Sequence, residues 1–201
     1  MLPLSRVRER VGAHRPALHS VRHAHTLEAS VALVLHEATG SGRPELLFIQ
    51  RAEREGDPWS GHMAFPGGRR QTEDPDLEST TLRETHEEVG FTPDRVLGRL
   101  DDFAGSRGPA IPHLVVAALV CESDLRPEIR PNHEVRSSIW VPLDWIRSRE
   151  SRLWHRVGPD GEPRPAFRYE GYVVWGLTYR ILRGFFQVLG EPLALDSDER
   201  G

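Results

Sequence analysis

The chain has 201 residues, which suits one domain with short additions. Its 30 acidic and 26 basic residues give a net charge of −4, which gives no support to non-specific nucleic-acid binding. One cysteine, Cys121, excludes an internal disulfide, and the apolar run before it predicts a core position. The apolar runs are far shorter than the about 18 residues of a membrane span, and the N-terminus lacks the apolar stretch of a secretory signal. We therefore expect a cytoplasmic protein that binds neither nucleic acid nor membrane.

Hydrophobic periodicity and turn residues divide the chain into strands and helices. Short runs rich in Val, Leu and Ile predict strands at residues 29–36, 45–52, 63–65, 97–103, 113–121 and 138–141. Helices are expected at residues 4–14, at 77–89, from Pro142 onward, and across a closing segment in which Val173, Leu177, Ile181, Phe185 and Val188 recur at helical spacing. The first two strands are expected to form a hairpin. Strands with helices before, between and after them predict an α/β sandwich.

The same pattern predicts how the chain is divided. The expected parts are an N-terminal helix and connector at residues 1–27, a main domain at 28–190 and a C-terminal tail at 191–201. No internal repeat or long linker splits the main domain, so we expect a single α/β unit.

The helix expected at residues 77–89 carries three acids on one face. At about 100° per residue, Glu84, Glu87 and Glu88 fall within a sector of about 100°. Like charges three and four residues apart on a helix repel each other. A divalent cation held by oxygen ligands would turn this repulsion into binding. Gly90 predicts the end of the helix.

Adjacent glycines, Gly67 and Gly68, stand upstream of this helix and allow close approach of the backbone. Gly68, followed after a spacer by the run RETHEEVGF at residues 83–91, resembles the Nudix box: Gly, spacer, Arg-Glu, apolar, any residue, Glu-Glu, any residue, Gly, apolar. The resemblance covers roughly residues 29–188 and implies a Nudix-type α/β/α sandwich with a mixed sheet. Here the spacing from Gly to Arg is one residue longer than usual in the family. The candidates for the first glutamate of the box are Glu73, Asp74 and Asp76.

The resemblance implies metal-dependent hydrolysis of a diphosphate bond, with Mg²⁺ or Mn²⁺ as the cofactor. The implied metal ligands are Glu84, Glu88, Glu87 and the carbonyl oxygen of Gly68. Arg83 is expected to pair with a box carboxylate and orient it. Glu134 lies in a segment that supplies an extra acid in some relatives, so it is either a general base or ligand, or a solvated loop charge. The side chains and backbone expected to meet the substrate are those of Arg51, Arg54, Trp59, Gly67 and Arg69.

Two further segments resemble the coenzyme A pyrophosphatase branch of the family. They are GHMAFPGG at residues 61–68 and WGLTYRIL at 175–182. They imply coenzyme A or its thioesters as substrate, with 3′,5′-ADP and 4′-phosphopantetheine as products. Asp57 stands where this branch carries an arginine, for which Arg54 is a candidate substitute. This departure keeps ADP-ribose, NADH and dinucleoside polyphosphates open as substrates.

Two interpretations without catalysis also remain. In one, the chain is a Nudix-fold module that binds a ligand for regulation. In the other, the acids are merely a solvated helix face of a structural protein, which the glycines and Arg83 in register oppose. Turnover of a small nucleotide would exclude both. Nudix relatives are often dimers, which leaves a homodimer open by analogy alone.

Overall fold

The structure is a computed structural model that describes residues 2–18, 26–38, 42–57, 59–105, 114–157 and 161–193. Its helices are α1 (Leu4–Ala13), α2 (Leu77–Val89), α3 (Leu143–Arg147) and α4 (Gly176–Val188), with a 3-10 turn, η1 (Arg149–Ser151). Its strands are β1 (Leu27–Ala38), β2 (Arg43–Arg51), β3 (Met63–Ala64), β4 (Gly67–Arg69), β5 (Arg95–Arg99), β6 (Phe103–Gly105), β7 (Leu114–Ser123), β8 (Val135–Pro142), β9 (Arg152–His155), β10 (Arg164–Tyr169) and β11 (Tyr172–Val174).

β1 and β7 lie at the centre of an eight-stranded mixed sheet formed by β1 to β8. They run parallel, with Leu27 beside Leu114 and His36 beside Ser123. The other recorded pairings are antiparallel: β2 joins β1, β3 and β8, β4 joins β1, and β5 and β6 join β7. The near-continuous apolar runs of β1 and β7 are buried, as expected of parallel strands covered on both faces.

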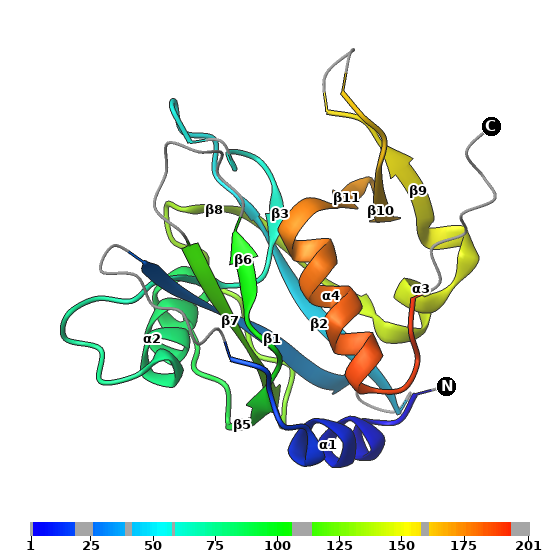
Figure 1. Cartoon of the computed structure of the whole chain (residues 1–201), viewed down its shortest axis with the longest axis horizontal. Coiled ribbons are helices and arrows are strands. Elements are labelled where there is room, and N and C mark those ends of the chain that lie inside the picture. The colour runs from blue at the N-terminus through cyan, green and yellow to red at the C-terminus, as the bar shows by residue number, and fades with distance from the viewer. Residues whose placement is uncertain are drawn as a thin grey trace.

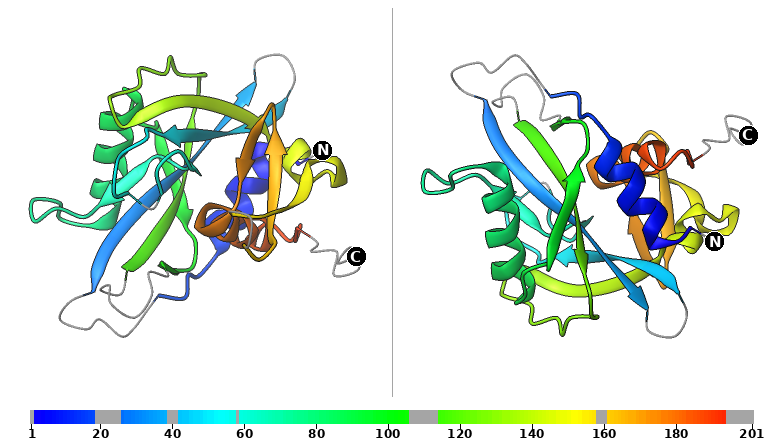
Figure 2. Two further views of the ribbon diagram at one scale, coloured as in Figure 1. Left: turned by 90° about the horizontal axis from the view of Figure 1, so that it is seen from above. Right: turned by 90° about the horizontal axis from the view of Figure 1, so that it is seen from below.

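Helices cover both faces of this sheet, with α2 on one side and α1 and α4 on the other (Figures 1 and 2). Side chains alternate between the two cores, so that Val34 faces α2 while Leu33 and Leu35 face α1 and α4. Cys121 belongs to the core under α2, where burial raises the pKa of its thiol to about 12. The expected α/β/α sandwich and the core position of Cys121 are therefore confirmed.

The closing helix begins later than the hydrophobic spacing predicts. Val173 was expected in this helix but lies in β11, where it pairs with Arg168 of β10. The tight turn between these strands uses positive φ angles at Glu170 and Gly171, and Gly176 has a φ of 65° at the start of α4. Val173 falls on a helical period by coincidence, because cross-strand pairing with β10 determines its conformation. β9, β10 and β11 form a second, antiparallel sheet.

Two other expected elements differ in extent. β8 is twice as long as the strand expected at 138–141, because all of Val135–Pro142 runs along β2. The strand expected at 97–103 is instead two strands, β5 and β6, each of which pairs with a different part of β7. Strand pairing of this kind is set by distant residues and leaves little trace in local periodicity.

The expected N-terminal helix is confirmed as α1, and Leu4, Val7 and Val11 bury its apolar stripe in the core. The division at residues 27 and 190 stays a prediction. Residues 19–25 of the connector and 194–201 of the tail lie outside the described residues. Among the helices that the structure describes, none is both long and apolar enough to cross a lipid bilayer.

Candidate active site

α2 has the bounds that the sequence predicts, and its ends explain why. Asp76 caps the N-terminus by accepting a hydrogen bond from the Ser79 N–H at 2.7 Å. Gly90 ends the helix in the left-handed conformation, with a φ of 80°. On the buried side, the Thr85 hydroxyl donates to the Thr81 carbonyl at 2.7 Å. Thr85 can therefore stand where the family pattern has an apolar residue, because its hydroxyl is satisfied within the helix.

The two glycines of β4 bring backbone directly against the acids of α2. The Gly67 N–H donates to Glu88 Oε2 at 2.8 Å. A Cβ atom on Gly67 would lie 2.2 Å from the carbonyl oxygen of Ser30, and one on Gly68 would lie 2.5 Å from Glu84 Oε2. The backbone of β1 leaves no room for a side chain at Gly67, while at Gly68 the Glu84 carboxyl lies where a side chain would be, so glycine at 68 permits the close contact with α2.

Burial raises the pKa of two of the three box acids. Glu88 is 3 % exposed, and desolvation raises the pKa of its carboxyl to about 8, against the hydrogen bond from Gly67 and with a contribution from the nearby charge of Glu84. Desolvation also raises the pKa of Glu84, although Arg83 opposes this. Glu87, in contrast, is exposed at the surface. Two carboxyls thus lie side by side in a site where ionisation is costly.

Arg83 binds three carboxylates at once. Its Nε and Nη2 reach the two Oδ atoms of Asp74 at 2.9 and 2.8 Å, and its Nη1 lies 3.0 Å from Glu84 Oε1 and 3.2 Å from Glu87 Oε2. The expected pairing of Arg83 with box carboxylates is present in this geometry. The bidentate bond to Asp74 fixes the plane of the guanidinium and, through it, the carboxylate of Glu84.

Of the three acids that the sequence offers as the first acid of the box, Asp74 is the one that Arg83 binds. Its side chain is buried, and the bonds from Arg83 hold the pKa of its carboxyl well below the usual value. Asp76 is instead the helix cap, and Glu73 is exposed. The sequence signal that could have singled out Asp74 is its position, nine residues before Arg83 and two residues before the helix cap Asp76.

Of the two arginines expected to bind substrate, Arg51 lies near Glu88 and Arg54 is paired with Glu134. Arg51 Nη2 pairs with Asp57 Oδ2 at 2.9 Å, and the charge of Arg51 opposes the rise in the pKa of Glu88. Arg54 Nη2 pairs with Glu134 Oε1 at 3.2 Å. The charge of Glu134 contributes to the raised pKa of both Glu84 and Glu88, so Glu134 faces the acidic site.

The remaining expected residues are placed less directly. Trp59 is half-buried and packs against the larger core, while its N–H donates to Asp57 Oδ1 at 3.0 Å. The Arg69 side chain is exposed. Its backbone carbonyl accepts a hydrogen bond from Arg83 Nη2 at 3.3 Å. A cavity of about 650 Å³ lies elsewhere, along β8, and none of the expected site residues lines it.

As the side chains stand, no three His, Cys, Asp or Glu side chains within the described ranges surround one point closely enough to hold a metal ion. The contacts above give the reason. Arg83 draws Glu84 and Glu87 toward itself, and the Gly67 N–H holds one oxygen of Glu88. The donor set still suits a hard cation, because it consists of carboxylate oxygens in a desolvated place beside a backbone without a Cβ.

A three-layer fold whose glycine-supported helix presents Arg-Glu-x-x-Glu-Glu defines the class of this protein. The family model described as the NUDIX domain matches residues 26–158, and the chain belongs to the Nudix family. It is a Nudix hydrolase that acts on a nucleoside diphosphate-linked substrate. Nudix hydrolases generally need divalent metal ions for this reaction.

Particular relatives agree with this assignment. The chain is 33 % identical to the Nudix hydrolase NudL of Citrobacter koseri, over 79 % of this chain and 82 % of that protein. It is 29 % identical to the human mitochondrial coenzyme A diphosphatase NUDT8, over 80 % of this chain and 70 % of that protein. The protein C14C4.10c of Schizosaccharomyces pombe is 39 % identical over half of this chain. The aligned region covers only 32 % of the length of that protein. The fold resembles that of a MutT/nudix family protein from Enterococcus faecalis, with a TM-score of 0.54, 16 % identity and coverage of 86 % and 70 % of the two chains.

Proposed function

We propose that this Nudix hydrolase cleaves the diphosphate of coenzyme A or its thioesters to give 3′,5′-ADP and 4′-phosphopantetheine. The observation that carries the proposal is the alignment with a coenzyme A diphosphatase over 80 % of the chain. That length exceeds the residues matched by the general family model. The segments at 61–68 and 175–182 support the same substrate, because they resemble the coenzyme A branch.

We assign Mg²⁺ or Mn²⁺ to Glu84 and Glu88, with Glu87 and the Gly68 carbonyl as further ligands. The raised pKa values of Glu84 and Glu88 support this choice, since a divalent cation would favour the ionised form of both carboxyls. The absence of a Cβ at Gly68 leaves its backbone open toward Glu84. When bound, the metal neutralises the diphosphate oxygens and increases the acidity of water.

The protein's own groups then orient the reactants. Asp74 holds Arg83, which in turn holds Glu84 at 3.0 Å, so that the ligand carboxylate is presented in one orientation. We assign to Glu134 the role of accepting the proton of the attacking water, whose oxygen forms a new bond to phosphorus as the bridging P–O bond breaks. We assign to Arg51 and Arg54 the binding of the remaining phosphate oxygens, and the charge of Arg51 close to Glu88 supports this for Arg51.

A panel of substrates tests this proposal. Purified protein with Mg²⁺ is incubated with coenzyme A, ADP-ribose, NADH and diadenosine polyphosphates, and the products are separated by chromatography. We expect 3′,5′-ADP to be released from coenzyme A faster than any product from the other compounds. Faster cleavage of ADP-ribose would overturn the substrate, and tight binding without turnover would favour a regulatory module. A cytoplasmic location and a homodimer also stay proposals, to be checked by fractionation and by solution mass.

A further inference from the structure

β8 is an open edge of the main sheet. One side of it pairs with β2, from Glu45 beside Pro142 to Arg51 beside Val135. In the described part of the chain, residues 137–141 make no main-chain hydrogen bond except within this pairing. An unpaired strand edge is a template for another strand, and proteins usually protect it with charged residues or proline. Arg136 and Pro142 stand near the two ends of β8, but residues 137–141 between them, SSIWV, contain neither a charge nor a proline.

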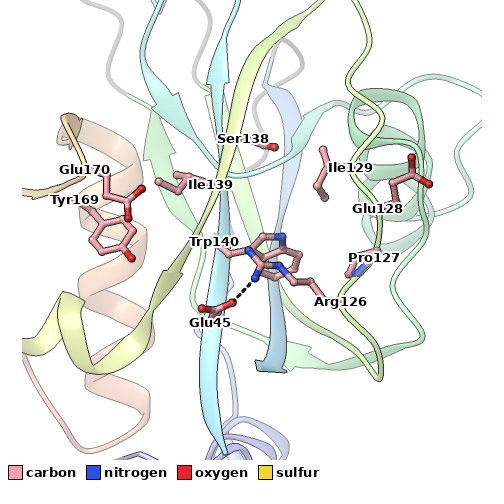
Figure 3. Close-up of a pocket in the computed structure, with 10 residues that line it drawn as sticks. All are labelled: Glu45, Arg126, Pro127, Glu128, Ile129, Ser138, Ile139, Trp140, Tyr169 and Glu170. Carbon is pink, nitrogen blue, oxygen red and sulfur yellow. Dashed lines mark ion pairs between the residues drawn. The ribbon is translucent and has the colours of Figure 1, made fainter. Parts of the chain in front are cut away.

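The cavity of about 650 Å³ lies along this open edge. Ser138, Ile139 and Trp140 all line it. Successive side chains of a strand point to opposite faces, so a cavity lined by three residues in a row reaches around the strand at its open edge, and Glu45 of β2 shows that it also extends over one face. Figure 3 shows β8 running between two walls, residues 127–129 on one side and 169–170 on the other. The result is a groove whose floor is the free edge of a strand.

The chemistry of the groove favours a basic segment. Three glutamates and one arginine line it, and that arginine, Arg126, is already partnered. Its guanidinium carbon lies 5.9 Å from the centre of the Trp140 ring, and its Nη1 lies 3.6 Å from Glu45 Oε2. The Arg126 side chain is 56 % exposed, so an incoming Lys or Arg can take its place over the Trp140 ring or bind beside it. Glu128 on one wall is paired with Arg130 at 2.8 Å, so the exposed Glu170 on the other wall carries the acidic character that an incoming cation would meet.

We propose that the outer edge of β8 is a docking site for an extended segment of a partner protein, in which Lys or Arg alternates with apolar residues. The segment pairs with β8 as an added strand. On one face its side chains meet Trp140 and Ile129, and on the other they meet Ile139 and Tyr169. In this mode of recognition, main-chain hydrogen bonds give affinity and the alternating side chains give specificity.

A labelled hexapeptide of alternating valine and arginine tests this site on the full chain, without substrate. We expect saturable binding by fluorescence anisotropy and slower hydrogen exchange at residues 138–140. The same peptide with every main-chain amide methylated keeps its charge but has no N–H to donate at either edge, and should bind at least about tenfold more weakly. Glu170→Lys should weaken binding by about fivefold, while Glu162→Lys, an equal change of charge on an exposed loop, should not.

Three outcomes overturn the proposal. The first is the absence of saturable binding by the hexapeptide. The second is equal binding of the methylated peptide, which would reduce the effect to general attraction between charges. The third is a dimer of the free protein in which residues 138–140 are already protected, since the groove would then be an interface between copies of this chain.

Discussion

Replacing Glu88 by glutamine separates the stability of the site from its activity. The Glu88 carboxyl has a pKa of about 8 in the folded protein, against an ordinary value of 4.5. Between these values the folded chain keeps a proton that the unfolded chain has released, so the free energy of unfolding falls as the pH rises. At about 1.4 kcal/mol per pKa unit, the loss at pH 7 is about 3 kcal/mol. Glutamine keeps the size of the side chain and an oxygen that can accept from the Gly67 N–H, and it carries no charge.

We therefore expect metal-free Glu88→Gln to be more stable than the parent protein by about 3 kcal/mol at pH 7, and to match it near pH 4.5. Its turnover should be largely lost. Urea denaturation across this pH range, with a chelator present, measures the difference. Added Mg²⁺ should stabilise only the parent protein. Glu87→Gln is the matched control, since Glu87 is exposed and does not contribute to the raised pKa of Glu88, so the loss of stability caused by Glu88 at rising pH should remain. If Glu88→Gln and the parent protein lost stability in parallel as the pH rose, Glu88 would not be the buried neutral acid described above.

Three other changes test separate parts of the structure. Gly68→Ala should lower kcat by about 100-fold with the circular dichroism spectrum unchanged, because the new methyl group displaces Glu84; near-normal turnover would contradict the close contact. Asp74→Asn should lower kcat or metal affinity by about 10–100-fold, since it weakens the hold on Arg83; Mg²⁺ titration of activity distinguishes the two, and no change in either would remove Asp74 from the site. Leu4→Ala should cost about 2–5 kcal/mol in urea denaturation with kcat intact, because Leu4 is buried; no loss would place α1 outside the folded unit.

Local signals were sufficient to predict α2 and its acidic face. Gly90 marks the end of the helix in the sequence, and the structure confirms this; Asp76, expected only as a candidate acid of the box, is the residue that caps the start. The glycine pair was also readable as a close approach of backbone. The groups that these glycines approach cannot be predicted from local sequence, because Ser30 lies in β1 and Glu84 in α2.

The features that were not predicted depend on distant partners. Three acids within four residues were equivalent in sequence, and only the approach of Arg83 selects Asp74. The start of α4 was placed too early because Val173 pairs across to β10. The depth of burial of Glu88 also escaped prediction, since an acid on a helix face next to Glu87 reads as solvated.

Burial at Glu88 links these observations. β1 holds β4 through pairs such as Ser30 with Gly68, and β4 then covers one edge of α2. The contact with β4 removes water from Glu84 and Glu88. Among the described residues, one hydrogen bond compensates the Glu88 carboxylate, from the Gly67 N–H. The fold therefore holds two acids close together with less compensation than they would have in water, which costs stability in the metal-free chain. A cation at this place would offset that cost, and the same desolvation would strengthen its attraction to the carboxylates. Affinity for a metal ion and low stability of the metal-free chain would then both follow from one contact, between β4 and α2.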